Sequence, residues 1–154
     1  GTTSRGLGDV YKRQTLSCMK KIIKCEDIEF QIYIEDTDFQ GVVYHSNYLK
    51  YFERSRSEFL SYANISQNKL REKDLAFIVK SIKINYLKAA ELGNQIVVQS
   101  NVEKKSDARM IFYQKVVDKI SGEEFVNGEV EVCFINLSSK KPKKFPDDLL
   151  LIFD

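Results

Sequence analysis

One amphipathic segment sets the architecture that we expect for this chain. Residues 47–63 read NYLKYFERSRSEFLSYA. At about 100° per residue, their aromatic and small side chains gather on one helical face. That face consists of Tyr48, Tyr51, Phe52, Ser55, Phe59, Tyr62 and Ala63, with Leu49 and Leu60 beside it. Ser46 or Asn47 is placed to cap the first turn. The pattern predicts a helix over residues 47–63 that the rest of the fold largely encloses.

The flanking segments have the two-residue period of β-strands. Residues 28–34 form a first strand ahead of the helix, and residues 64–74 form a polar linker behind it. Four further strands are predicted at residues 76–87, 95–103, 111–118 and 125–137. Short turn-forming segments separate them, so we expect consecutive antiparallel pairing. The order predicts an α+β fold in which a five-stranded antiparallel sheet covers one long helix, because nothing else can hide the apolar face.

Single residues within these elements have predicted structural roles. Gly128 suits a bulge that helps the sheet to curl. Arg56 is expected to form a partly buried ion pair with Glu53, one turn earlier on the helix. Cys133 is expected to be a small core side chain. The chain should end in a short helix over residues 149–153, packed on the edge of the sheet.

The length and composition indicate one domain. With 154 residues, of which 43% are hydrophobic, the chain can bury an ordinary core. Residues 1–18 are rich in Gly, Ser, Thr and Arg and lack apolar periodicity. We interpret them as a disordered extension or a cloning scar, and we place the single domain at residues 19–154, starting at Met19.

Charge and cysteine content exclude several classes of protein. Residues 1–18 carry the whole net charge of +2, so the domain itself is neutral, which disfavours a nucleic-acid partner. Cys18, Cys25 and Cys133 are irregularly spaced, which argues against a disulfide framework and against a zinc site. No apolar run approaches the roughly 18 residues of a membrane span. We therefore expect a soluble cytoplasmic protein without an integral membrane segment.

An acidic loop between the first strand and the helix is the candidate reactive site. Asp36 and Asp38 follow the strand, and Gly41 permits a turn before the helix begins. A carboxylate would thus lie beside a helix amino terminus, whose free N–H groups can polarise a carbonyl oxygen. Apolar side chains would wall this site: Val42, Val43 and Tyr44. The combination is typical of hydrolysis, although either aspartate alone is equally typical of a turn.

A longer pattern around the loop resembles a known family. It reads Tyr33-x-x-Asp36-Thr37-Asp38-x-x-Gly41-Val42-Val43-Tyr44-His45-x-x-Tyr48-Leu49-x-x-x-Glu53-Arg54-x-Arg56. The pattern is similar to the signature of the 4-hydroxybenzoyl-CoA thioesterase family, in particular to the bacterial acyl-CoA thioesterases encoded with the Tol-Pal cell-envelope system. This resemblance implies the hot-dog fold, in which a five-stranded antiparallel sheet wraps around one helix.

The resemblance also implies an activity and the residues that perform it. It implies hydrolysis of acyl-CoA to a free acid and CoA, with Asp38 as the nucleophile or as the base that activates water. The backbone N–H of His45 would contact the developing oxyanion, so the imidazole itself is not required. Family members pair so that the active site lies between subunits. We therefore expect a homodimer or homotetramer, with acyl carrier protein as a further candidate partner.

Other residues have two interpretations each. Tyr44 and Tyr48 belong either to the core or to the acyl pocket that Val42 and Val43 would also line. Basic side chains around one predicted hairpin either contact the phosphates of CoA or form a solvated surface. They are Lys104, Lys105 and Arg109.

Competing functions find less support in the sequence. His45 is the single histidine, and no GxSxG motif is present, which disfavours a Ser-His-Asp mechanism. The chain offers neither clustered metal ligands nor a glycine-rich nucleotide loop, so we expect no metal and no cofactor. The loop pattern also fits a hot-dog dehydratase poorly. The alternative that stays open is a non-catalytic module that binds acyl-CoA or acyl carrier protein and recruits envelope or lipid-synthesis partners.

Overall fold

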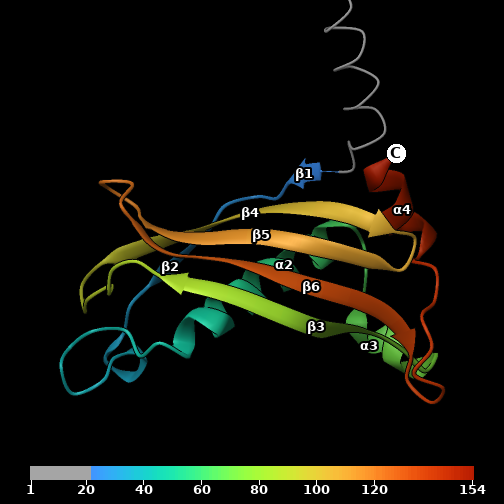
Figure 1. Cartoon of the computed structure of the whole chain (residues 1–154), viewed down its shortest axis with the longest axis horizontal. Coiled ribbons are helices and arrows are strands. Elements are labelled where there is room, and N and C mark those ends of the chain that lie inside the picture. The colour runs from blue at the N-terminus through green and yellow to red at the C-terminus, as the bar shows by residue number, and fades with distance from the viewer. Residues whose placement is uncertain (1–21) are drawn as a thin grey trace, which may run out of the picture.

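An antiparallel sheet covers one long helix in the computed structural model, which describes residues 22–154 (Figure 1). The strands are β1 (Ile22–Lys24), β2 (Ile28–Gln31), β3 (Leu75–Tyr86), β4 (Gln95–Ser106), β5 (Arg109–Asp118) and β6 (Glu124–Asn136). The helical elements are the 3₁₀ turn η1 (Ile34–Asp36) and the helices α2 (Asn47–Tyr62), α3 (Gln67–Glu72) and α4 (Asp147–Phe153). The predicted α+β architecture is confirmed. The expectations about residues 1–18 lie outside the described residues.

The order of the strands departs from the predicted meander. The sheet runs β1-β4-β5-β6-β3, with β2 also paired to β4. Strands β4, β5 and β6 are consecutive neighbours as expected, but β3 pairs with β6 at the opposite edge of the sheet. The connection over residues 87–94 therefore crosses the end of the sheet from β3 to β4. This crossing was not predicted, because the local pattern of a strand does not specify its neighbour.

The first edge of the sheet is shorter and more broken than expected. Strand β2 ends at Gln31, and the chain then turns into η1, where Ile34 is 77% exposed. Upstream of β2, the segment β1 pairs with the far half of β4. Cys25 lies at the bend between β1 and β2 and is buried, and this burial raises the pKa of its thiol to about 12. The sheet thus has six strand segments where the sequence predicts five.

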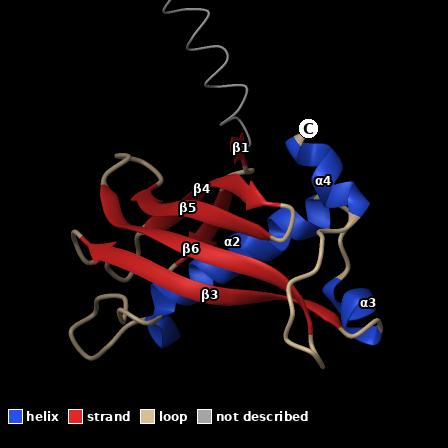
Figure 2. Cartoon of the chain, turned by 45° about the vertical axis from the view of Figure 1, so that its right-hand side comes forward, coloured by secondary structure: helices blue, strands red, loops and turns tan. Residues whose placement is uncertain are grey.

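Helix α2 lies behind the strands and buries the predicted face against them (Figures 1 and 2). Its boundaries agree with the prediction within one residue. Seven of its residues are buried: Tyr48, Tyr51, Phe52, Ser55, Arg56, Phe59 and Leu60. Tyr62, expected on this face, is 77% exposed, whereas the next residue, Ala63, is buried, so Tyr62 lies outside the buried face. Phe52 is fully buried, so the middle of the helix is the part held most tightly.

A buried polar network fixes how α2 sits on the sheet. Arg56 donates from Nη1 to Oε1 of Gln114 on β5, at 2.9 Å. The Gln114 amide donates in turn to the Phe52 carbonyl and to Ser100 Oγ, both at 3.0 Å. Ser55 and Ser100 share a hydrogen bond of 3.1 Å. Because unpaired polar groups are costly in a core, this network favours one register of helix against β4 and β5.

The expected ion pair between Arg56 and Glu53 is wrong. Among the described residues, Arg56 bonds to Gln114, and Glu53 instead accepts from the Ser57 hydroxyl at 2.7 Å. Burial lowers the pKa of Arg56, and the charge of Glu53, which is not in contact, partly opposes this shift. The sequence could not identify Gln114 because it lies 58 residues away.

Three smaller expectations are also revised or confirmed. The linker over residues 64–74 contains the helix α3, whose first turn is capped by Ser66. The predicted C-terminal helix is present as α4, which buries Leu149 and Phe153. Cys133 is half-buried, because it shares the outer face of the sheet with its strand neighbours Ile78 and Arg109.

Gly128 has a different role from the predicted bulge. The register of β6 is regular at this position, opposite Ile84 on one side and Gln114 on the other. A Cβ atom at Gly128 would lie 2.7 Å from the Lys83 carbonyl oxygen and 3.0 Å from Cε2 of Phe52. Glycine is therefore required because the helix packs directly against the backbone of β6 here.

We predict that Gly128→Ala destabilises the fold by about 1–3 kcal/mol, because the added methyl group must displace the Phe52 ring or bend the strand. Urea unfolding would measure the loss. The matched control is Glu129→Ala, the next residue on the strand, whose exposed side chain lies on the outer face and whose removal should stay within about 0.5 kcal/mol. Equal stability of both variants would contradict this interpretation.

Candidate active site

The acidic loop folds into a small hairpin. Thr37 and Val43 face each other as an antiparallel bridge. The Asp38 N–H donates to the Val42 carbonyl at 2.9 Å, and the Gly41 N–H donates to the Asp38 carbonyl at 3.0 Å. Gly41 closes the turn with φ of +80°, a backbone conformation that residues with a Cβ atom rarely adopt. The predicted turn role of Gly41 follows from this geometry.

The hairpin docks on the connection between β3 and β4. The Val43 N–H donates to the Ala90 carbonyl at 2.8 Å, and the Leu92 N–H donates to the Gly41 carbonyl at 3.1 Å. Val42 forms an isolated bridge with Glu91. Val43 is also buried, so Val42 and Val43, two of the three predicted wall residues, are held by backbone pairing.

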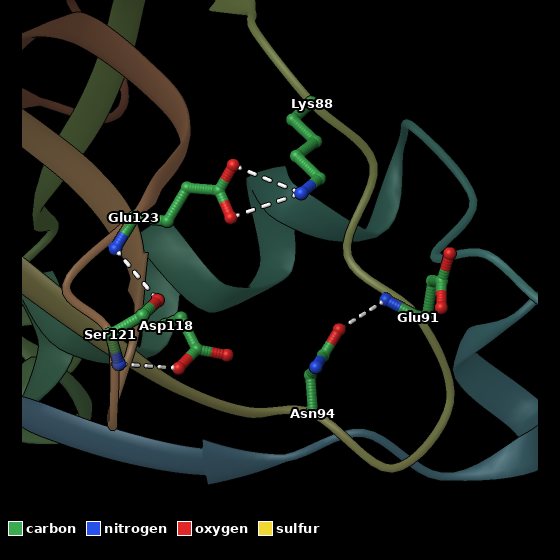
Figure 3. A network of polar contacts seen from close by, with 6 residues as sticks. All are labelled: Lys88, Glu91, Asn94, Asp118, Ser121 and Glu123. Atoms are coloured by element: carbon green, nitrogen blue, oxygen red, sulfur yellow. Dashed lines mark hydrogen bonds and ion pairs between the residues drawn. The ribbon is translucent and has the colours of Figure 1, made fainter.

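Polar contacts brace that connection from outside (Figure 3). Lys88 binds both carboxylate oxygens of Glu123 at 3.0 Å, which ties the connection to the β5–β6 turn (Figure 3). The Glu91 N–H donates to Asn94 Oδ1 at 2.7 Å, and Asp118 accepts from the Ser121 N–H at 2.9 Å (Figure 3). The support of the hairpin thus extends across both loops at this end of the sheet.

Asp38 is presented with one of its two carboxylate oxygens free. Oδ1 accepts from the Gln40 N–H at 2.9 Å, an Asx turn that fixes the side chain. Oδ2 has no hydrogen-bond partner among the described residues, and the side chain is only half-buried. Asp38 therefore has a fixed orientation and one oxygen available to attack a carbonyl carbon or to accept a proton.

The amino terminus of α2 begins immediately after the hairpin and is not capped by a side chain. Ser46 occupies the cap position but makes no cap hydrogen bond, so the predicted capping is wrong. Asn47 instead turns its amide toward the loop and donates to the Asp36 carbonyl at 2.7 Å. Within residues 22–154, the His45 N–H donates no hydrogen bond. Uncapped N–H groups at a helix start are suitable donors to an oxyanion.

Asp36 anchors the base of the loop. Its Oδ2 accepts from the Tyr33 N–H at 2.8 Å, and its carbonyl also accepts from the Tyr44 N–H at 3.0 Å. The Tyr51 hydroxyl below it is buried and, in the described part of the chain, makes no hydrogen bond. Burial, and then the nearby charge of Asp36, raise the pKa of Tyr51. Asp36 thus holds the base of the loop through its carbonyl and its carboxylate, beside the residues that precede and follow the loop.

Aromatic side chains surround His45 and the start of α2. The Tyr86 hydroxyl donates to the His45 carbonyl at 3.2 Å, and the His45 ring packs against Tyr44 with centroids 4.4 Å apart. Tyr48 is buried, and its hydroxyl accepts from the Ala90 N–H at 3.1 Å. Sequence reasoning missed Tyr86, because its contact with His45 spans 41 residues and no local pattern marks it. Of the two tyrosines with two interpretations, Tyr48 belongs to the core, whereas Tyr44 is 47% exposed and lies outside it.

The structure does not bring the predicted basic residues to Asp38 within one subunit. Lys104, Lys105 and Arg109 lie at the far end of β4 and the start of β5. The Asp38 hairpin docks on the connection that ends where β4 begins, at Gln95. Lys105 lies ten residues further along the same strand, a distance of about 33 Å. Each basic side chain also meets a carboxylate: Lys104 with Asp107 at 2.7 Å, Lys105 with Glu103 at 2.6 Å, and Arg109 with Glu131 at 3.7 Å.

Residues 22–154 contain neither a cluster of metal ligands nor a helix that could span a membrane. No group of three or more His, Cys, Asp or Glu side chains in this range is arranged to hold a metal ion. No helix in the same range combines the length and apolar composition needed to cross a membrane.

Comparisons with known proteins relate this chain to thioesterases. Residues 32–153 match the family model described as the thioesterase-like superfamily. The acyl-CoA thioesterase YbgC of Haemophilus influenzae is 36% identical over 124 residues, which cover 80% of this chain and 90% of that protein. The range matched by the family model includes the acidic loop, α2 and the long strands.

Solved structures show the same fold. A probable thioesterase from Bartonella henselae superposes with a TM-score of 0.71 at 33% identity, over 79% of this chain and 98% of that one. A 1,4-dihydroxy-2-naphthoyl-CoA thioesterase from Synechocystis superposes with a TM-score of 0.80 at 20% identity, over 85% of this chain and 96% of that one. The second similarity concerns the fold alone.

We predict that Tyr48→Phe destabilises the protein by about 1–2 kcal/mol, because it leaves the buried Ala90 N–H without its acceptor. Urea unfolding would measure the change. Tyr62→Phe removes an exposed hydroxyl from the same helix and serves as the control, with an expected effect below about 0.5 kcal/mol. If Tyr48→Phe is as stable as the control, the hydroxyl does not support the wall of the site.

Proposed function

We propose that this chain, which belongs to the thioesterase-like superfamily and is a thioester hydrolase, cleaves acyl-CoA with Asp38 as its catalytic carboxylate. The observation that carries the proposal is the pairing of two free groups. Asp38 keeps one oxygen unbonded on a fixed hairpin, and the His45 N–H is unbonded at the uncapped start of α2. The acyl-CoA thioesterase activity of the relatives supports acyl-CoA as the substrate class.

The proposed reaction places the thioester between these two groups. The carbonyl oxygen would accept from the His45 N–H, where the partial positive charge of the helix terminus stabilises the developing oxyanion. The free Asp38 oxygen would then face the carbonyl carbon. The collapse of the tetrahedral intermediate breaks the carbon–sulfur bond and releases CoA as a thiolate, which takes up a proton.

Two routes are compatible with this arrangement. As a base, Asp38 takes a proton from water while the hydroxide oxygen forms the new carbon–oxygen bond. As a nucleophile, Asp38 forms a mixed anhydride that water then hydrolyses to the free acid. The net change is the same in both: thioester and water give acid and thiol. Neither route uses the His45 imidazole, whose ring packs against Tyr44.

The free edge of the sheet supports the expected homodimer. Strand β3 pairs with β6 on one side, and its other edge is unpaired among the described residues. Val79, Ile82 and Tyr86 point to the helix side of this edge, opposite residues that are buried, yet they are 46%, 39% and 48% exposed. A long apolar edge strand is a liability unless it is covered, and a second copy paired through β3 would cover it.

In such a dimer, the predicted contacts to CoA would come from the partner subunit. The catalytic hairpin lies near the end of β3, where Tyr86 meets His45. The hairpin that carries Lys104, Lys105 and Arg109 lies near the beginning of β3, since Arg109 and Ile78 both pair with Cys133. Antiparallel pairing of two β3 strands brings the beginning of one to the end of the other. The partner's basic hairpin would then lie on the Asp38 side, within reach of CoA phosphates.

Several expectations from the sequence stay predictions. They concern the cytoplasmic location, the link to the Tol-Pal system, acyl carrier protein as a partner, and a homotetramer built from two dimers. The roles of Val42, Val43, Tyr44 and Tyr48 in binding the acyl group also belong here.

We predict that Asp38→Asn lowers kcat for acyl-CoA hydrolysis by roughly 100-fold or more, because the amide can neither attack nor accept a proton. Release of free thiol from short, medium, long and aromatic acyl-CoAs would measure it. Glu35→Gln makes the same chemical change on a nearby exposed carboxylate and should stay within about 2-fold. A fully active Asp38→Asn variant would refute the site. Binding of acyl-CoA by the parent protein without any thiol release would favour the non-catalytic alternative.

We predict that Ile82→Lys converts a dimer into a monomer, because it adds a charge to the apolar side of the β3 edge. Sedimentation equilibrium of parent and variant would show the change in mass. Ile120→Lys adds the same charge at a position that is 90% exposed in the β5–β6 turn, and it should leave the assembly unchanged. A monomeric parent, or a dimeric Ile82→Lys variant, would rule out pairing through β3.

A further inference from the structure

The side chain of Asn47 joins two segments that the proposed reaction requires. Asn47 is the first residue of α2, and its Nδ2 donates to the Asp36 carbonyl at 2.7 Å across 11 residues of chain. The contact is partly buried, and it is the shortest of the hydrogen bonds between the helix start and the acidic loop. It therefore connects the segment that carries Asp38 to the segment that carries the His45 N–H.

The geometry is not that of an ordinary helix cap. Asparagine near a helix start commonly accepts from N–H groups of its own first turn. Asn47 donates to the preceding loop instead, and Ser46 makes no cap bond. The N–H groups of Asn47 and Leu49 donate to the Tyr44 and Ser46 carbonyls at 2.9 and 3.2 Å, whereas those of His45 and Ser46 have no acceptor among the described residues. The Asn47 side chain meanwhile holds the loop in place.

The Asp36 carbonyl is the meeting point of these contacts. It accepts from Asn47 Nδ2 and from the Tyr44 N–H, and these two donors flank His45 in the sequence. On its other side, Asp36 precedes Asp38 by two residues and is itself held by the Tyr33 N–H. The Asp36 carbonyl oxygen is thus hydrogen-bonded to residues on both sides of His45, the proposed oxyanion donor, and lies two residues before Asp38, the proposed catalytic carboxylate.

We propose that Asn47 is a positioning residue for thioester hydrolysis, which sets the separation of Asp38 and the His45 N–H through the Asp36 carbonyl. The inference rests on the proposed function and adds a residue that touches neither substrate nor reacting atoms. Rates of enzymatic reactions depend steeply on such separations, and a misplacement of about 1 Å can cost about 100-fold. Without the amide, the Asp36 carbonyl keeps only its bond from Tyr44, on a loop that must also turn at Gly41.

Two substitutions separate this role from the stability of the helix. Asn47→Ala removes the donor and introduces a good helix former. Asn47→Asp keeps the size but replaces the donor by an acceptor, and a negative charge in the first turn favours the helix. We expect both variants to lower kcat by roughly 10- to 100-fold while KM changes by less than about 3-fold. The melting temperature of Asn47→Asp should fall by no more than about 3 °C.

The control for charge is Ser46→Asp, which adds the same charge one residue earlier, at an exposed side chain that makes no cap bond. If positioning is the cause, both Asn47 variants lose more kcat than Ser46→Asp. Equal losses in Asn47→Asp and Ser46→Asp, with Asn47→Ala unaffected, would assign the effect to the field at the helix terminus and overturn the inference.

The Asn47 variants and the Asp38→Asn variant together distinguish a failure of the positioning role from a failure of the proposed function. An inactive Asp38→Asn variant beside fully active Asn47 variants would remove the positioning role and leave the catalytic assignment intact. An active Asp38→Asn variant would remove the site itself. Hydrogen exchange adds a second readout, because the Tyr44 N–H shares the Asp36 carbonyl and should lose protection when the Asn47 amide is removed.

Discussion

The structure depends on burying the apolar face of α2 against the sheet. Phe52 at the middle of that face is fully buried, and the backbone of β6 approaches its ring so closely that a side chain at Gly128 has no space. Loss of a buried aromatic ring costs about 3–5 kcal/mol, so this contact dominates any single contribution from the surface. Once the centre of the helix is fixed, its first turn has a fixed position at the end of the sheet.

The candidate site uses that fixed position. The hairpin with Asp38 is paired to the β3–β4 connection through Val43 and Ala90, and it meets the start of α2 through Asn47. A helix start without a side-chain cap sacrifices about 1 kcal/mol of local stability. The same omission leaves the His45 N–H without an acceptor among the described residues, and the proposed reaction uses it as the oxyanion donor. The loss of stability and the proposed catalytic use therefore have one structural cause, namely the orientation of Ser46 and Asn47.

The parts of the fold that were predictable from sequence are those with a local periodic pattern. The limits of α2 and of the four long strands follow from spacings of about 3.6 and 2 residues, which are properties of adjacent residues. The position of β3 beside β6, the bond from Arg56 to Gln114 and the approach of Phe52 to Gly128 are long-range. In the candidate site, the family resemblance predicts the roles of Asp38 and His45. The contacts of Asn47 and Tyr86 were not predictable, because they depend on which loops meet in the fold.

The burial of Cys25 has a consequence for an enzyme whose product is itself a thiol. Thiol–disulfide exchange and oxidation require a thiolate, and burial raises the pKa of the Cys25 thiol, which disfavours the thiolate. Cys25 also lies at the bend between β1 and β2, where its side chain is buried. It is therefore a poor nucleophile toward any disulfide form of the product thiol, and the bend that leads from β1 to β2 contains no reactive thiolate.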